Sequence, residues 1–246
     1  MDKKWDGRPD PELLLRQNFP EGESDGKGKL KIFFGYAAGV GKTYAMLDAA
    51  RQEKEAGRDV VAGYIEPHDR PDTMALLDGL EFLPPRTVGY KGIVLREFDL
   101  DAALIRRPDL ILVDELAHTN AQGSRHRKRC QDVTELLDAG INVYTTVNVQ
   151  HLESLHDIVA SITHVRVSER IPDSVFDNAS QVELVDISPE ELRQRLEEGK
   201  IYHKNQADKA KISFFTLENL SALREIALRR TADRVNREVI RERDAA

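Results

Sequence analysis

The stretch LKIFFGYAAGVGKTYAML, residues 30–47, decides the fold of this chain. An apolar run is followed by a loop of small residues, after which Gly41, Lys42 and Thr43 open a helix. In such a strand–loop–helix unit, backbone N–H groups and the positive end of the helix dipole point at phosphate groups. The pattern predicts a P-loop, with Lys42 on the β- and γ-phosphates and the Thr43 hydroxyl on Mg²⁺. The alternative is a glycine-rich turn that binds no ligand.

The glycine spacing of this loop is irregular. The usual spacing places the first glycine at position 36, but this chain has Tyr36 there and Gly35 one position earlier. We still expect the loop and the first helical residues to contact the nucleotide. The expected nucleotide-binding residues are Gly35, Gly39, Val40, Gly41, Lys42, Thr43 and Tyr44.

A second motif, LILVDE at residues 110–115, places two carboxylates directly after four apolar residues. On a buried strand Asp114 would emerge at the carboxyl end, beside the P-loop, where it can hold a magnesium-bound water. Glu115 is then a candidate catalytic base that polarises an attacking water, although a solvated acidic residue is the alternative. The two motifs together predict ATP and Mg²⁺ as ligands, with Thr43 and Asp114 as the metal-binding residues.

Two further polar segments follow strands of the predicted sheet. Residues 116–128 form a basic loop in which Arg125 or Arg127 could contact a γ-phosphate; a solvated loop is the alternative. Asn148 and Gln150 are candidates for sensing the γ-phosphate or orienting a water, and a turn with an N-cap explains Asn148 equally well.

The alternation of strands and helices predicts an α/β fold: a P-loop NTPase-like, mostly parallel sheet, doubly wound, with helices on both faces. The strands near residues 32 and 111 are almost wholly apolar, as expected when both faces of a sheet are covered. The expected strands are residues 29–34, 59–65, 86–90, 109–113 and 142–147. The expected helices are residues 42–56, 72–79, 100–106, 126–139 and 150–161.

The chain divides into three expected parts: a helix at 11–17 with a polar linker (1–28), a nucleotide-binding core (29–168), and a helical C-terminal extension (169–246). In the extension, a capping box at Ser188 opens a helix to about residue 198, and another helix is expected at 206–214. The last helix has an apolar face, from Leu217 to Ala227, that fades into charged residues. This predicts a helix leading to a partner or a following domain, and a solvated helix fits the pattern equally well.

Composition excludes several classes of partner. A formal net charge of −7 argues against nucleic acid, and the apolar runs are too short to insert into a bilayer. The N-terminal residues lack the apolar segment of a signal peptide, and a single cysteine fits a reducing compartment, so we expect a cytoplasmic location. Basic neighbours could lower the pKa of that cysteine, Cys130, but a packed inert thiol is the favoured interpretation.

Five motifs carry a family resemblance: GYAAGVGKTYAML, LILVDELAHTNA, GSRH, TTVNVQHLESL and, at residues 226–235, IALRRTADRV. Together they resemble the cytoplasmic N-terminal domain of the KdpD family, the potassium- and turgor-responsive sensor histidine kinases that control a potassium-uptake ATPase. The resemblance covers nearly the whole chain. Three residues depart from the family pattern: Tyr36 stands where a small residue is usual, Gln122 where proline is usual, and Cys130 where tryptophan is usual.

The resemblance implies an ATP-binding domain that tunes the kinase and phosphatase output of a sensor kinase. It implies the remaining kinase domains as partners, with the response regulator as a further candidate, and a tether to the inner membrane through later helices. No histidine lies in the phosphoacceptor context His-Glu-aliphatic-Arg-Ser/Thr-Pro, so we expect no histidine kinase activity from this chain alone. We favour a regulatory ATP-binding module over a working NTPase or an interaction domain with a vestigial nucleotide site.

Overall fold

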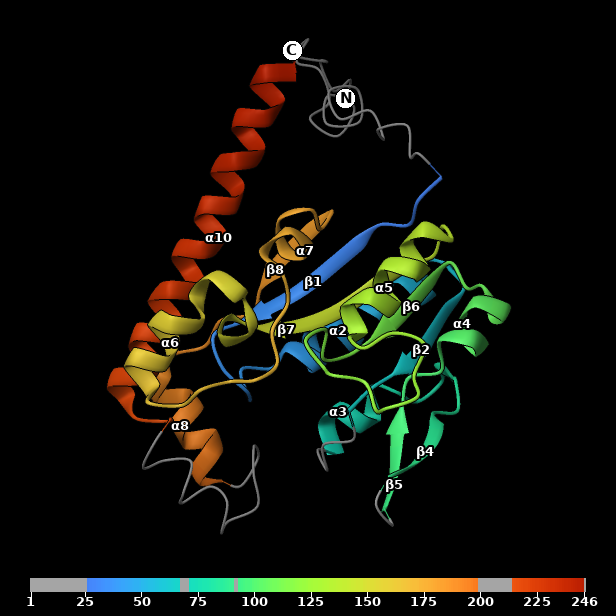
Figure 1. Ribbon diagram of the computed structural model, residues 1–246, viewed down its shortest axis with the longest axis horizontal. Coiled ribbons are helices and arrows are strands. Elements are labelled where there is room, and N and C mark those ends of the chain that lie inside the picture. The colour runs from blue at the N-terminus through green and yellow to red at the C-terminus, as the bar shows by residue number, and fades with distance from the viewer. Residues whose placement is uncertain (1–25, 67–70, 91–92, 199–213, 246) are drawn as a thin grey trace, which may run out of the picture.

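The computed structural model describes residues 26–66, 71–90, 93–198 and 214–245 (Figure 1). The helix expected at 11–17 lies outside these residues, as does the helix expected at 206–214 except for its last residue. None of the described helices combines the length and the apolarity that a membrane span requires.

A six-stranded sheet in the order β3-β2-β6-β7-β1-β8 forms the centre of the fold. Every neighbouring pair in it is parallel. The strands are β1 (Leu30–Gly35), β2 (Val60–Tyr64), β3 (Glu81–Phe82), β6 (Leu110–Val113), β7 (Asn142–Asn148) and β8 (Gln181–Leu184). The predicted α/β class with a mostly parallel sheet is confirmed.

Both faces of the sheet are covered because its central strands are apolar on both sides. Alternate residues of β1 belong to two separate clusters, Ile32 and Phe34 to one and Phe33 to the other. Helix α2 covers the Phe33 face, and α4, α5, α6, α7, α8 and α10 contribute to the Ile32 face. The helices are α2 (Lys42–Glu55), α3 (Pro71–Ala75), α4 (Leu100–Arg106), α5 (Arg129–Asp138), α6 (His156–Thr163), α7 (Asp173–Asp177), α8 (Pro189–Glu197) and α10 (Leu217–Ala245).

One expected strand of the sheet lies outside it. Strand β4 (Arg86–Tyr90) forms at the predicted residues but pairs antiparallel with β5 (Ile93–Glu97) in a separate ribbon (Figure 1). The physical reason is its composition, because Arg86 and Thr87 are exposed and the strand lacks the continuous apolar run of a buried parallel strand.

The sheet also contains a strand that the sequence did not predict. Strand β8 pairs in parallel with β1 at the sheet edge, where Gln181 is exposed and the next three residues are partly buried. Polar and apolar residues alternate in this strand, so it lacks the apolar run that identified the central strands. Part of the expected C-terminal extension therefore completes the sheet.

Three predicted helices have different bounds in the structure. The helix expected at 126–139 begins at Arg129, because Lys128 is extended and its N–H bonds the Gln131 side chain at 3.0 Å. The helix expected at 150–161 is instead two 3-10 turns, η1 (Val149–His151) and η2 (Glu153–Leu155), followed by α6. Helix α3 covers only the first part of residues 72–79.

Helix α10 is confirmed as a long C-terminal helix, and its charged half is anchored to the body of the protein. Arg230 and Arg234, only 6% and 5% exposed, contact α7. Arg230 donates to Asp177 at 2.6 Å and lies 4.7 Å from the centre of the Phe176 ring, and Arg234 donates to backbone carbonyls of residues 176 and 179. Beyond these contacts the helix extends past the other described elements (Figure 1).

We predict that Arg230→Ala destabilises the protein by about 1–3 kcal/mol, because it removes a charged hydrogen bond and leaves Asp177 with fewer partners. Urea unfolding followed by circular dichroism measures this change. Arg229→Ala is the matched control: Arg229 is exposed and pairs only along the helix with Glu225, so we expect a change below about 0.5 kcal/mol. Equal effects of the two substitutions would contradict the anchoring role.

Candidate nucleotide-binding site

The glycine-rich loop, residues 35–43, lies at the carboxyl end of β1 and leads into α2. Gly39 and Gly41 have φ angles of 89° and 108°, in the left-handed region that glycine adopts without steric cost. Gly41 is the N-cap of α2, so the backbone turns into the helix at this residue. These two glycines therefore fix the shape of the loop.

Gly35 explains how the loop accommodates its irregular spacing. A Cβ atom on Gly35 would lie 2.6 Å from Val40 Cγ2 and 3.0 Å from Lys42 Cδ. The missing side chain makes room for Lys42, which is 8% exposed and donates from Nζ to the Ala37 carbonyl at 3.1 Å. The lysine is thus folded back onto the loop.

Tyr36 is part of the core. Its side chain is fully buried, and its hydroxyl donates to the Ile187 carbonyl at 3.1 Å. Burial, with the nearby charge of Asp186, raises the pKa of this hydroxyl well above its usual range. The residue that departs from the usual glycine pattern therefore ties the loop to the segment between β8 and α8.

Asp114 and Thr43 come together as predicted for a metal site. Asp114 is 1% exposed, and its Oδ2 accepts from the Thr43 hydroxyl at 3.2 Å. The Thr146 hydroxyl donates to the other carboxylate oxygen, and the Glu66 N–H donates to Oδ2 at 3.4 Å. Carboxylate and hydroxyl oxygens are hard donors that suit Mg²⁺, so these side chains fit the expected ion.

Glu115 lies next to this pair with an unusual backbone conformation. Its φ is 58°, which is uncommon for a residue with a side chain and is found often at functional sites. Its N–H donates to Asp114 Oδ1 at 3.1 Å and to Thr146 Oγ1 at 3.2 Å. The carboxyl reaches solvent, but surrounding atoms displace much of its water, and this loss, together with the charges of Asp114 and Glu66, raises its pKa to about 7. Such a pKa suits a general base.

Asn148 lies directly beside the start of the loop. It pairs in register with Gly35, because β7 is the neighbour of β1. The side-chain oxygens of Asn148 and Gln150 are both buried and have no hydrogen-bond partner among the described residues. Buried polar atoms without partners are rare in folded proteins, and here they fit a site that a ligand or water completes.

The loop that follows Glu115 is held by a buried arginine that sequence reasoning missed. Arg129 is fully buried, donates to the Asp114 carbonyl at 2.9 Å and to Glu97 at 3.4 Å, and stacks 4.1 Å from the centre of the Tyr64 ring. His118 Nε2 lies 3.0 Å from the same Glu97 carboxylate. Burial alone would raise the pKa of Glu97, but the bonds and charges of His118 and Arg129 lower it below its usual value.

The structure does not bring Arg125 to the glycine-rich loop. Its guanidinium pairs with Asp101 of α4 and Glu135 of α5, so its hydrogen bonds fasten the 116–128 loop to these helices. The expected contact of Arg125 with a phosphate stays a prediction. Cys130 is buried, and burial raises the pKa of its thiol despite the neighbouring Lys128, as the inert interpretation requires.

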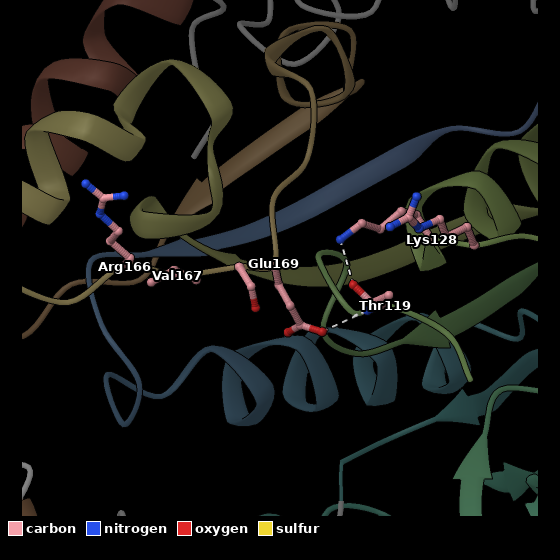
Figure 2. Close-up of a pocket in the computed structure, with 7 residues that line it drawn as sticks. Thr119, Lys128, Arg166, Val167 and Glu169 are labelled. Carbon is pink, nitrogen blue, oxygen red and sulfur yellow. Dashed lines mark hydrogen bonds between the residues drawn. The ribbon is translucent and has the colours of Figure 1, made fainter. Parts of the chain in front are cut away.

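Arg127, the other candidate, lines a cavity of about 620 Å³. Thr119 and Lys128 lie on one side of the cavity, and residues 166–169 lie on the other. Lys128 Nζ donates to Thr119 Oγ1 at 2.7 Å, and the Thr119 N–H donates to Glu169 at 2.8 Å. Figure 2 shows Lys128 and Glu169 approaching Thr119 from opposite sides, whereas Arg166 points away from them. Lys128 and Arg166 point in different directions (Figure 2), and none of the lining residues belongs to the glycine-rich loop.

Tyr44 lies one position after Thr43 in α2 and is 48% exposed. Gly41, the N-cap of the same helix, faces the C-terminal part of the chain. A Cβ atom on Gly41 would lie 3.8 Å from Arg195 Nη1 and 3.9 Å from Val185 Cγ1. The predicted loop residues therefore lie together with Asp114, Glu115 and Asn148, and Arg195 of α8 joins them, although no local sequence pattern indicated it.

Comparisons with known proteins identify the family of this chain. The family model for the KdpD osmosensitive K⁺ channel His kinase sensor domain matches residues 26–235. The Clostridium acetobutylicum sensor protein KdpD is 64% identical over 232 residues, which are 94% of this chain and 26% of that protein. The Escherichia coli sensor protein KdpD is 57% identical over 94% of this chain and 26% of its own length. The Mycobacterium tuberculosis sensor protein KdpD is 53% identical over 84% of this chain and 24% of its own length.

The chain therefore spans about a quarter of the length of these curated relatives. The match to the family model covers most of the chain and includes both the glycine-rich loop and the Asp114-Glu115 strand end. The chain belongs to the KdpD family of osmosensitive K⁺ channel histidine kinase sensor domains.

Proposed function

We propose that this domain binds Mg-ATP at the glycine-rich loop and that its occupancy regulates a potassium- and turgor-responsive sensor histidine kinase, shifting the balance of kinase and phosphatase activity. The observation that carries the nucleotide proposal is the hydrogen bond from Thr43 to Asp114. It unites the loop after β1 with the carboxyl end of β6, as a metal–phosphate site requires. The family supports the sensor part of the proposal.

Each side chain has a distinct role in binding. On binding, Lys42 Nζ leaves the Ala37 carbonyl and bonds phosphate oxygens. The loop N–H groups and the N-terminus of α2 bind the same negatively charged phosphates. Thr43 and Asp114 would hold Mg²⁺ through their side-chain oxygens, and the ion would supply positive charge to offset that of the phosphates. The unpartnered oxygens of Asn148 and Gln150 hold a water beside the terminal phosphate.

Regulation requires that the ligand bind two conformations with different affinity. The loop is linked to α10 through the segment between β8 and α8. Tyr36 bonds the Ile187 carbonyl, and the adjacent Asp186 accepts from Arg224 of α10 at 2.6 and 2.8 Å. A change in the loop can therefore move α10, which leads towards the partners of this domain, the remaining kinase domains and the response regulator.

Slow ATP hydrolysis is a second candidate function, and Glu115 favours it. Its carboxyl is adjacent to the metal-binding pair, and its pKa near 7 leaves it able to accept a proton at neutral pH. A regulatory site needs a ligand that persists, so we expect hydrolysis to be slow if it occurs.

Lys42→Ala tests nucleotide binding. We expect a loss of Mg-ATP affinity of about 10- to 100-fold, because a charge-assisted bond to phosphate is removed. Titration calorimetry measures both proteins, and Lys54→Ala, in the last turn of the same helix, is a control with unchanged affinity. If the wild type does not bind Mg-ATP, the domain is an interaction module and the proposal is wrong.

Glu115→Gln separates binding from hydrolysis. We expect Mg-ATP affinity within about threefold of the wild type and phosphate release reduced about 100-fold or more, the range for loss of a general base. Phosphate release at saturating Mg-ATP measures the rate. Turnover that survives this substitution would contradict a base role for Glu115.

Arg224→Ala tests the link to α10. In the wild type we expect saturating Mg-ATP to change hydrogen exchange in residues 217–235, and we expect the substitution to abolish at least half of that change, because it removes the paired bond to Asp186. Arg229→Ala, which pairs within α10, serves as the matched control. An unaltered response in Arg224→Ala would exclude this route.

A further inference from the structure

We propose that residues 185–195, which lead from β8 through α8, form the wall that binds the nucleoside of the nucleotide, with Arg195 stacking on the base. This inference rests on the proposed nucleotide function, and it assigns a binding surface to the nucleoside, the end of the ligand that the loop itself does not bind. The ligand class is a nucleoside triphosphate, recognised partly through its aromatic base.

The metal-binding pair sets the direction of the ligand. Thr43 and Asp114 mark the β- and γ-phosphate end, and Asp114 belongs to the β6 side of the sheet order β6-β7-β1-β8. That side is filled by Asp114, Glu115 and Thr146, which bond one another. The α-phosphate and the nucleoside therefore leave the loop on the opposite side of β1, where β8 lies.

Two side chains of different chemistry face the loop on the β8 side. Arg195 Nη1 and Val185 Cγ1 both lie within van der Waals contact, 3.8 and 3.9 Å, of the position a Gly41 Cβ atom would occupy. Arg195 Nη1 also donates a long bond, 3.4 Å, to the Gly39 carbonyl. A planar, permanently charged guanidinium stacks on an aromatic base and can bond a phosphate oxygen, while a valine packs against the ribose or base.

The wall is held in place before any ligand arrives. The Val185 N–H donates to the Phe34 carbonyl at 2.8 Å, which continues the pairing of β8 with β1. Glu191 accepts from Arg195 Nη2 at 2.7 Å and orients the guanidinium. The Tyr36 hydroxyl donates to the Ile187 carbonyl and so fixes the position of that residue. A binding surface fixed in this way loses little conformational freedom when the ligand binds.

The test compares Mg-ATP with inorganic Mg-triphosphate, which has the phosphates but no nucleoside. We expect Arg195→Ala to weaken Mg-ATP about 10-fold, the scale of a desolvated cation–π contact, and to change triphosphate affinity less than about twofold. Arg195→Lys keeps the positive charge but lacks the planar guanidinium that stacks on a base, so we expect it to lower Mg-ATP affinity nearly as much. Arg229→Ala is the control, because this arginine lies outside the wall and, like Arg195, pairs with a glutamate four residues earlier in its own helix.

Equal weakening of both ligands would make Arg195 a phosphate-binding residue, and unchanged Mg-ATP affinity would remove it from the site; either result overturns the inference. Photocrosslinking of the wild type with 8-azido-ATP gives an independent measurement. We expect the adduct within residues 185–195, and an adduct confined to another segment overturns the inference. Failure of the wild type to bind Mg-ATP at all would instead overturn the proposed function.

Discussion

The buried carboxylate of Asp114 is the group around which the site is organised. A carboxylate removed from water is costly unless hydrogen-bond donors surround it. Here the donors come from Thr43, Thr146 and the backbone of Glu66 and Glu115, which belong to four separate segments at the carboxyl edge of the sheet. Only parallel strands bring four such ends to one edge, so the sheet topology and the satisfaction of this single charge depend on each other.

A second layer of contacts holds residues that lie outside the proposed phosphate site. Arg129 bonds the carbonyl of Asp114 and the carboxylate of Glu97, so the β4–β5 ribbon is fastened to the strand that carries the acidic pair. On the other side, Tyr36 fastens the glycine-rich loop to the segment after β8. At the position where the usual spacing has a glycine, the hydrogen bond from Tyr36 to the Ile187 carbonyl therefore fixes the loop.

The sequence predicted the elements whose signals are local. The apolar runs of β1 and β6 and the Gly-Lys-Thr opening of α2 each indicate their own structure. Strand β8 was missed because an edge strand needs no continuous apolar run, and the partners of Arg129 lie 15 and 32 positions away, where no local pattern reveals them. Arg230 and Arg234 lie where the apolar stripe of the last helix fades, a pattern that fits a partner-directed or a solvated helix, and neither alternative indicated that they are buried and donate to acceptors on α7.

The proposed regulation depends on the segment after β8 more than on the Asp114 cluster. Asp114 and its donors bond mainly one another at the carboxyl edge of the sheet. The segment after β8 is different, because it contacts the loop through Arg195 and α10 through Asp186 and Arg224. The Arg195 bond to Gly39 is 3.4 Å, at the long end of the hydrogen-bond range, so exchanging it for a ligand costs little. A ligand that contacts this segment shifts a population only if it binds two conformations of the domain with different affinity, as the proposed regulation requires.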